Sequence, residues 1–187
     1  MTFNVAQRGA HVATFRWIEV RLMETLAAWT PTTPEMEAKL LFGAHIWEAA
    51  QHADILGKRT HELRLPLQHS VKPQPAYVEY LDELRATTET AKRIAGFYDC
   101  ALSGLHRRFE EYLSQVDPLL DGPTVRLLDR IRYDMDRMVA ESRKLREEIA
   151  AFKEVDRHWL EALRGREAAV ARIATDVPVV EPARAPA

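Results

Sequence analysis

The stretch that decides the fold of this chain is residues 45–54, which read His-Ile-Trp-Glu-Ala-Ala-Gln-His-Ala-Asp. On a helix, positions three, four and seven apart share one face, so His45, Glu48 and His52 are expected to line a single stripe. Apolar residues extend this stripe in both directions, which predicts that it faces the core. Burying two imidazoles and a carboxylate is unfavourable without partners, and a metal ion or a hydrogen-bonded network is the usual compensation.

Length and composition restrict the class of protein. The 187 residues suit one domain, which we place at residues 1–175, followed by a proline-rich tail at residues 176–187 that we expect to be disordered. The 26 basic and 28 acidic residues nearly balance, so nucleic acid is not an expected partner. The sequence shows neither a leader peptide nor a run of about 18 apolar residues, which predicts a cytoplasmic protein that does not span a membrane.

Four long helices are predicted from apolar residues that recur every three or four positions. They cover residues 11–29, 34–63, 76–116 and 123–174, whereas residues 1–10 carry little pattern. Three prolines between residues 65 and 75 indicate a crossover between the second and third helices, and residues 117–123 break the chain before the last helix. With no strand pattern, the predicted fold class is all-α.

Two further side chains are candidates for the polar stripe. Glu19 falls on the apolar face of the first helix, and the short turn after residue 29 would bring it to the height of residues 45–48. Alternatively, Glu19 lies at the boundary of the core and its carboxylate points outward to solvent. On the third helix, Tyr98 lies on the core face, either as a packed core tyrosine or as a redox neighbour of a metal.

This combination resembles the ferritin-like superfamily of four-helix bundles. There, two helices each provide a Glu and two others each provide a Glu-x-x-His motif, and together they hold two iron or manganese ions. Residues 47–54 and 117–128 are also similar to uncharacterised bacterial ferritin-like proteins, and the likeness spans residues 11–150. The resemblance implies an antiparallel four-helix bundle with a crossover and an iron or manganese site. The ligands that we assign to this site are Glu19, His45, Glu48, His52 and Asp134.

Two departures from the superfamily pattern affect the expected site. The spacing Glu48-x-x-x-His52 is one residue longer than Glu-x-x-His, although both side chains still share a face. On the fourth helix Asp134 stands for the Glu, but Arg137 occupies the position of the histidine. Because a guanidinium stays protonated and pairs with carboxylates, Arg137 could neutralise a cluster that no longer holds metal.

Three hypotheses about function follow from these patterns. The first is a non-haem iron or manganese oxidoreductase that acts on a small-molecule substrate. The second is a non-catalytic bundle that binds a partner or ligand without metal, and metal content would separate it from the first. The third is a self-associating structural protein, because the regular heptad seam of the fourth helix is longer than one bundle layer requires and favours a homodimer.

Overall fold

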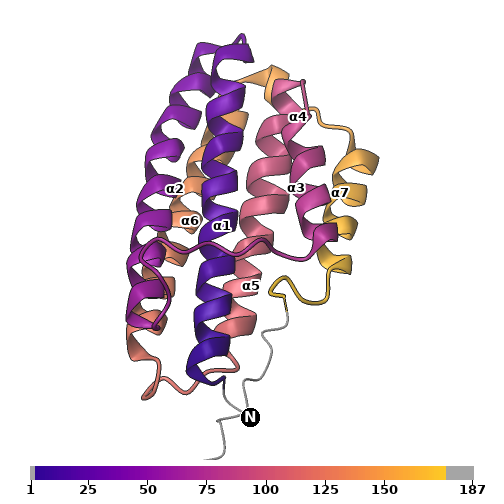
Figure 1. Ribbon diagram of the computed structural model, residues 1–187. Helices are drawn as coiled ribbons and strands as arrows, with labels where there is room; N and C mark the ends of the chain where they lie inside the picture. Colours follow the sequence, from indigo (N-terminus) through magenta and orange to yellow (C-terminus); the bar gives the residue numbers. More distant parts are fainter. Residues whose placement is uncertain (1–2, 176–187) are drawn as a thin grey trace, which may run out of the picture.

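The computed structural model describes residues 3–175, and its regular secondary structure in that range is entirely helical (Figure 1). This confirms the predicted all-α class. Two short 3₁₀ turns, Thr30–Thr32 and Ala150–Phe152, and one π-helical segment, Gly96–Leu102, accompany the α-helices. The α-helices are α1 (Val5–Trp29), α2 (Met36–Glu62), α3 (Pro75–Arg85), α4 (Thr90–Ala95), α5 (Ser103–Leu113), α6 (Gly122–Glu148) and α7 (Arg157–Ala169).

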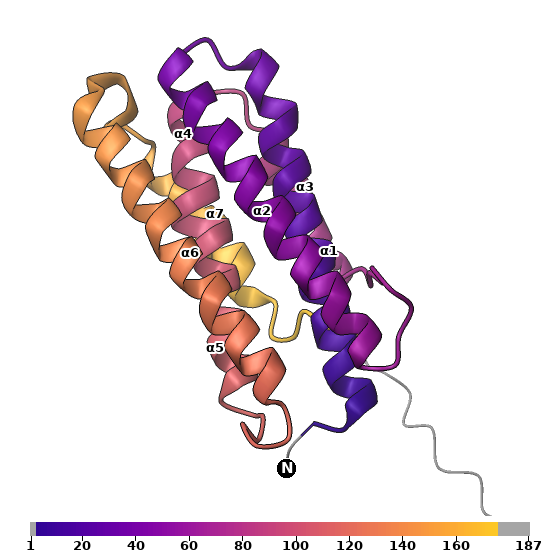
Figure 2. The same cartoon turned by 90° about the vertical axis from the view of Figure 1, so that its left-hand side faces the viewer.

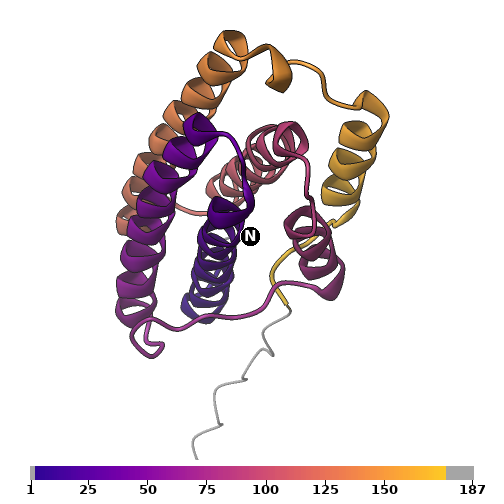
Figure 3. The ribbon, with the colours of Figure 1, turned by 90° about the horizontal axis from the view of Figure 1, so that it is seen from above.

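The long helices lie lengthwise beside one another and form the body of the molecule (Figures 1 and 2). Helix α1 packs along α2, α2 also contacts α6, and α6 contacts α5. Seen from above, α3 and α7 lie together on one side of these helices (Figure 3). Large aromatic side chains fill the interior, and they include Phe15, Trp29, Phe42, Phe97 and Phe109.

The first helix begins earlier than the sequence pattern predicts. Asn4 and Gln7 form a reciprocal capping box, in which each side chain accepts a hydrogen bond from the other residue's backbone N–H. The helix therefore starts at Val5, and Arg8 is already buried. The predicted start of the first helix at residue 11 is therefore wrong, because residues 5–10 are helical. The sequence feature that marks this start is the capping box and not a repeat of apolar residues.

The predicted third helix is interrupted. Instead of continuing from residue 76 to residue 116, it ends at Arg85 and resumes at Thr90, with Glu89 in an extended conformation before the new helix. Arg93 holds this corner, because its Nε donates to the Thr87 carbonyl oxygen at 2.9 Å and its Nη1 to Thr33 Oγ1 at 2.9 Å. The break is thus stabilised by contacts with distant residues.

The predicted fourth helix is also interrupted, between Glu148 and Arg157. The Asp156 side chain caps α7 by accepting from the backbone N–H groups of His158 and Trp159. Helix α7, which carries the C-terminal part of the predicted heptad seam, then packs against α3 and the π-helical segment. The C-terminal part of the predicted seam therefore has contacts within the chain, and the homodimer stays a prediction.

The proline-rich segment between α2 and α3 runs across the outside of α1 (Figure 1). Two backbone hydrogen bonds anchor this segment. The Val71 N–H donates to the Ala13 carbonyl oxygen at 3.1 Å, and the Gln74 N–H donates to the Ile173 carbonyl oxygen at 2.9 Å. No helix within residues 3–175 combines the length and apolar character needed to cross a membrane. The predicted tail, residues 176–187, lies outside the described residues.

Candidate metal centre

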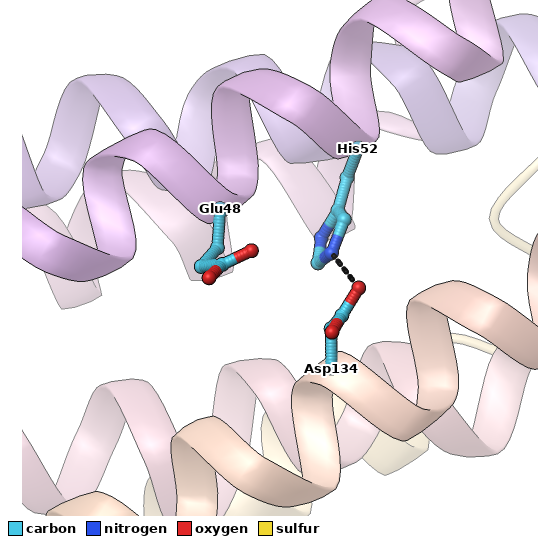
Figure 4. Close-up of side chains that lie close together, drawn as sticks. All are labelled: Glu48, His52 and Asp134. Carbon is cyan, nitrogen blue, oxygen red and sulfur yellow. Dashed lines mark ion pairs between the residues drawn. The ribbon is translucent and has the colours of Figure 1, made fainter.

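Three of the predicted ligands come together between α2 and α6. Glu48 and His52 project from α2 toward Asp134 on α6, and one ligand atom from each lies within 4.8 Å of the others (Figure 4). The four-residue spacing on α2 makes this possible, because it places both side chains on one helix face, one turn apart. Imidazole nitrogen and carboxylate oxygen are donors that suit a divalent ion such as iron or manganese.

Glu19 lies on the opposite side of the His52 ring. His52 Nδ1 is 3.4 Å from Glu19 Oε1, whereas His52 Nε2 is 3.6 Å from Asp134 Oδ2. A metal ion can bind only one of the two nitrogens of an imidazole ring, because their lone pairs point in different directions. The geometry therefore assigns Nε2 to the cluster with Asp134 and leaves Glu19 behind the ring, where it can accept a hydrogen bond from Nδ1.

The Glu19 and His52 side chains are buried and lack hydrogen-bond partners. Their exposed fractions are 1% and 2%, and neither the two Glu19 oxygens nor the two His52 nitrogens make a hydrogen bond to any described residue. The contact between them has the distance of an ion pair without the alignment of a hydrogen bond. Because buried polar atoms are nearly always satisfied, these four atoms are candidates for binding a ligand between α1, α2 and α6.

Neighbouring carboxylates control the charge of His52. Burial, the largest influence, lowers the pKa of His52, but Glu19 and then Asp134 raise it, and the net pKa lies above the ordinary value of 6.5. The two carboxylates thus stabilise the charged form of the His52 imidazole. A metal ion would have to replace the proton on Nε2, so binding would release a proton.

Arg137 borders the cluster on its more exposed side. Its Nη2 lies 2.6 Å from Glu48 Oε1 and 3.6 Å from Asp134 Oδ1, and its Nη1 lies 3.1 Å from Glu141 Oε1. The hydrogen bond to Glu48 is the main reason why the pKa of Arg137 is raised above its ordinary value. One guanidinium therefore neutralises carboxylates from both α2 and α6.

His45 is not part of the cluster, although it was predicted as a ligand. Its Nδ1 lies 2.6 Å from Tyr98 Oη and its Nε2 lies 2.8 Å from Glu141 Oε2. Since a carboxylate can only accept, Nε2 carries the proton and Nδ1 accepts from the tyrosine hydroxyl. Seven residues separate His45 from His52, which is about 10.5 Å along a helix and too far for both to bind one ion.

The hydrogen bonds around His45 form a continuous chain that runs from the buried Tyr98 to the partly exposed Glu48. The order is Tyr98, His45, Glu141, Arg137 and Glu48, so it connects the core of the bundle with the cluster. Burial lowers the pKa of His45 and raises that of Tyr98, so both are neutral near pH 7. Sequence reasoning missed Glu141, although its spacing of four residues after Arg137 and seven after Asp134 places it on the same face of α6.

Tyr98 reaches His45 from the π-helical segment Gly96–Leu102. A π-turn inserts one extra residue per turn and shifts the side chains that follow, and such turns are frequent at functional sites. Gly96, at the start of the segment, allows close packing, because a Cβ there would lie 2.6 Å from Leu84 Cδ1 and 3.0 Å from the Trp159 ring. The tertiary packing of α3 and α7 thus supports the position of Tyr98.

Comparison with models of protein families found no match, and comparisons with curated proteins and with solved structures found none either. The site must therefore be interpreted from its own geometry.

Proposed function

We propose that this helical bundle is ferritin-like and binds one iron or manganese ion through Glu48, His52 and Asp134, and that it serves as a non-haem oxidoreductase for a small-molecule substrate. The observation that supports this most directly is the set of four buried polar atoms on Glu19 and His52 that form no hydrogen bond, although the two side chains are ion-paired, beside carboxylates from two helices.

The residues present fit such an ion in number, chemistry and support. Glu48 and Asp134 supply two negative charges for a divalent cation, and neutral His52 supplies a nitrogen. Glu19 would accept the Nδ1 proton of His52 and so fix its tautomer, as carboxylates behind metal-bound histidines commonly do. Glu19 is thus a positioning residue and not a ligand in this proposal.

The protein surroundings are suited to a reaction that needs a partly dry site. A bound iron or manganese ion would supply one-electron and dioxygen chemistry. His52 and Glu19 close the inner side of the site, while the Glu48 and Asp134 side chains remain 25% and 19% exposed. A small substrate could therefore reach the site only from the side that Arg137 borders.

The contacts of Arg137 favour a second candidate, a bundle that binds a partner or ligand without metal. Its guanidinium is already paired with Glu48 and Asp134, so the cluster is partly neutralised in the metal-free chain. This candidate leaves the two buried His52 nitrogens without hydrogen bonds, and we therefore place it second.

Elemental analysis of protein purified without chelator or affinity metal separates the two candidates. The wild-type chain is compared with His52→Ala and with the control His61→Ala, which changes an exposed histidine on the same helix. We expect close to one iron or manganese per chain in the wild type and in His61→Ala, and none in His52→Ala. Absence of metal in all three, with no binding of added Fe²⁺ or Mn²⁺, would favour the metal-free bundle.

A positive result would then justify a search for turnover. Oxygen consumption in the presence of candidate reductants is measured for the metal-loaded wild type and for His52→Ala. Turnover in the loaded wild type alone would support the oxidoreductase assignment, whereas binding without turnover would restrict the function to metal binding.

A further inference from the structure

The position of Arg137 bears on how metal could reach the site. Exposure of the side chains rises from 2% at His52 through 19% at Asp134 to 39% at Arg137. The guanidinium therefore lies on the solvent side of the cluster. An ion arriving from solvent would meet this positive charge before it reached the imidazole.

Arg137 and a metal ion compete for the same carboxylates. Its Nη2 donates to Glu48 Oε1 at 2.6 Å, a distance typical of a strong charge-assisted hydrogen bond. An oxygen atom held in this way is oriented toward the guanidinium and is less available to a second cation. A divalent ion beside the guanidinium would also be repelled by it, so the contact with Glu48 has to open before metal can bind.

Glu141 offers Arg137 an alternative position. It lies four residues further along α6, and its Oε1 already accepts from Arg137 Nη1 at 3.1 Å. Its other oxygen, Oε2, is 2.8 Å from Nε2 of the buried His45, which holds the carboxylate in place. Arg137 can therefore leave Glu48 and Asp134 while it remains paired with a fixed partner.

From this geometry we infer that Arg137 is a latch on the metal site. It pairs with Glu48 in the metal-free chain and moves toward Glu141 when a divalent ion binds, so that the protein holds either the guanidinium or the ion at Glu48. This inference rests on the proposed metal site and adds a regulatory step to it, because the latch weakens metal binding.

The test is calorimetric titration of chelator-treated protein with Mn²⁺. The variants are Arg137→Gln and the control Arg132→Gln, which removes an equal charge from the same helix at a residue that pairs with Glu110 and Asp129. Removal of a unit charge close to a divalent ion should raise its affinity by about tenfold or more in Arg137→Gln. We expect less than about a threefold change in Arg132→Gln, since Arg132 pairs with the exposed Glu110 and Asp129 and not with a proposed ligand.

A second comparison separates a moving latch from a simple charge effect. Glu141→Gln removes the partner to which the guanidinium retreats, while its side-chain oxygen can still accept from His45. In the wild-type background this change should weaken Mn²⁺ binding more than it does in the Arg137→Gln background. Equal effects in both backgrounds would overturn the movement toward Glu141.

The outcomes also distinguish the latch from the site itself. If Arg137→Gln binds Mn²⁺ no more tightly than the wild type while His52→Ala abolishes binding, the latch is wrong and the metal site stands. If neither the wild type nor Arg137→Gln binds Mn²⁺, both the site and the latch are wrong. Thermal unfolding of each metal-free variant confirms that it is folded before titration.

Discussion

Glu19 Oε1 on α1 and His52 Nδ1 on α2 lie 3.4 Å apart, and both side chains are almost completely buried. Helix α1 therefore contributes to the candidate site from behind the imidazole, not from the face that meets Asp134. In the metal-bound state that we propose, the carboxylate would select the His52 tautomer whose Nε2 lone pair points into the cluster.

Replacing Glu19 by Gln tests this role. We expect Mn²⁺ affinity to fall by about 10- to 100-fold, because the amide orients the imidazole less well and stabilises its charge less than a carboxylate does. Calorimetric titration measures the change, and Glu24→Gln, an exposed carboxylate on the same helix, serves as the control. Unchanged affinity in Glu19→Gln would show that Glu19 has no part in metal binding.

Replacing Tyr98 by Phe should lower stability without affecting metal binding. The change leaves the buried His45 Nδ1 without its 2.6 Å partner, which is expected to cost about 1–3 kcal/mol in the free energy of unfolding. Urea unfolding measures this loss, and Tyr133→Phe, at an exposed residue, should change it by less than about 0.5 kcal/mol. A large drop in Mn²⁺ affinity in Tyr98→Phe would instead connect the His45 chain to the metal site.

His11 should make stability depend on pH. Burial, followed by the charge of Arg172, lowers the pKa of His11 from 6.5 to about 4, so the folded chain binds fewer protons than the unfolded chain between these values. Its stabilising contribution is present above pH 6.5 and is lost as the pH falls toward 4, by at most about 3 kcal/mol. His11→Phe, which keeps an aromatic ring beside Phe3 and Tyr112, should remove this part of the acid sensitivity.

Unfolding of wild type and His11→Phe is compared at pH 7 and pH 5, with His61→Phe as an exposed control. The loss of stability between the two pH values should be smaller in His11→Phe than in the other two chains. An identical loss in all three would mean that His11 is not the group that titrates.

Asp121 should stabilise the end of the bundle that lies opposite the α1–α2 turn. It is fully buried and accepts hydrogen bonds from Arg59 Nη2 at 2.9 Å, Tyr112 Oη at 2.5 Å and Thr124 Oγ1 at 2.6 Å. Asp121→Ala leaves the buried Arg59 guanidinium with only the more exposed Glu62 as a carboxylate partner and removes the acceptor of Tyr112 and Thr124, which is expected to cost about 3 kcal/mol.

Chemical unfolding measures this effect, and Asp129→Ala provides the comparison. Asp129 is an exposed carboxylate on α6 that pairs only with Arg132 among the described residues, and its loss should cost less than about 1 kcal/mol. Similar losses in the two variants would contradict the structural role of the Asp121 network.

The main helices and part of the site were predictable from the sequence because they depend on local spacing. A period of three to four residues defined α1, α2 and α6, and prolines marked the segments between them. The spacing of Glu48 and His52 placed both on one face of α2 for the same reason. Asn4 and Gln7 were an overlooked local signal that extended α1 toward its N-terminus.

Long-range packing decided the rest. The break at residues 86–89 depends on the contact of Arg93 with Thr33, and the turn before α7 directs that helix back onto α3. Neither feature could be predicted from the spacing of apolar residues. The sequence by itself determined that the regular structure of residues 3–175 is helical and that Glu48 and His52 share a face. Only the tertiary structure decided that His52 meets Asp134 while His45 turns to Tyr98 and Glu141, because those partners come from helices far along the chain.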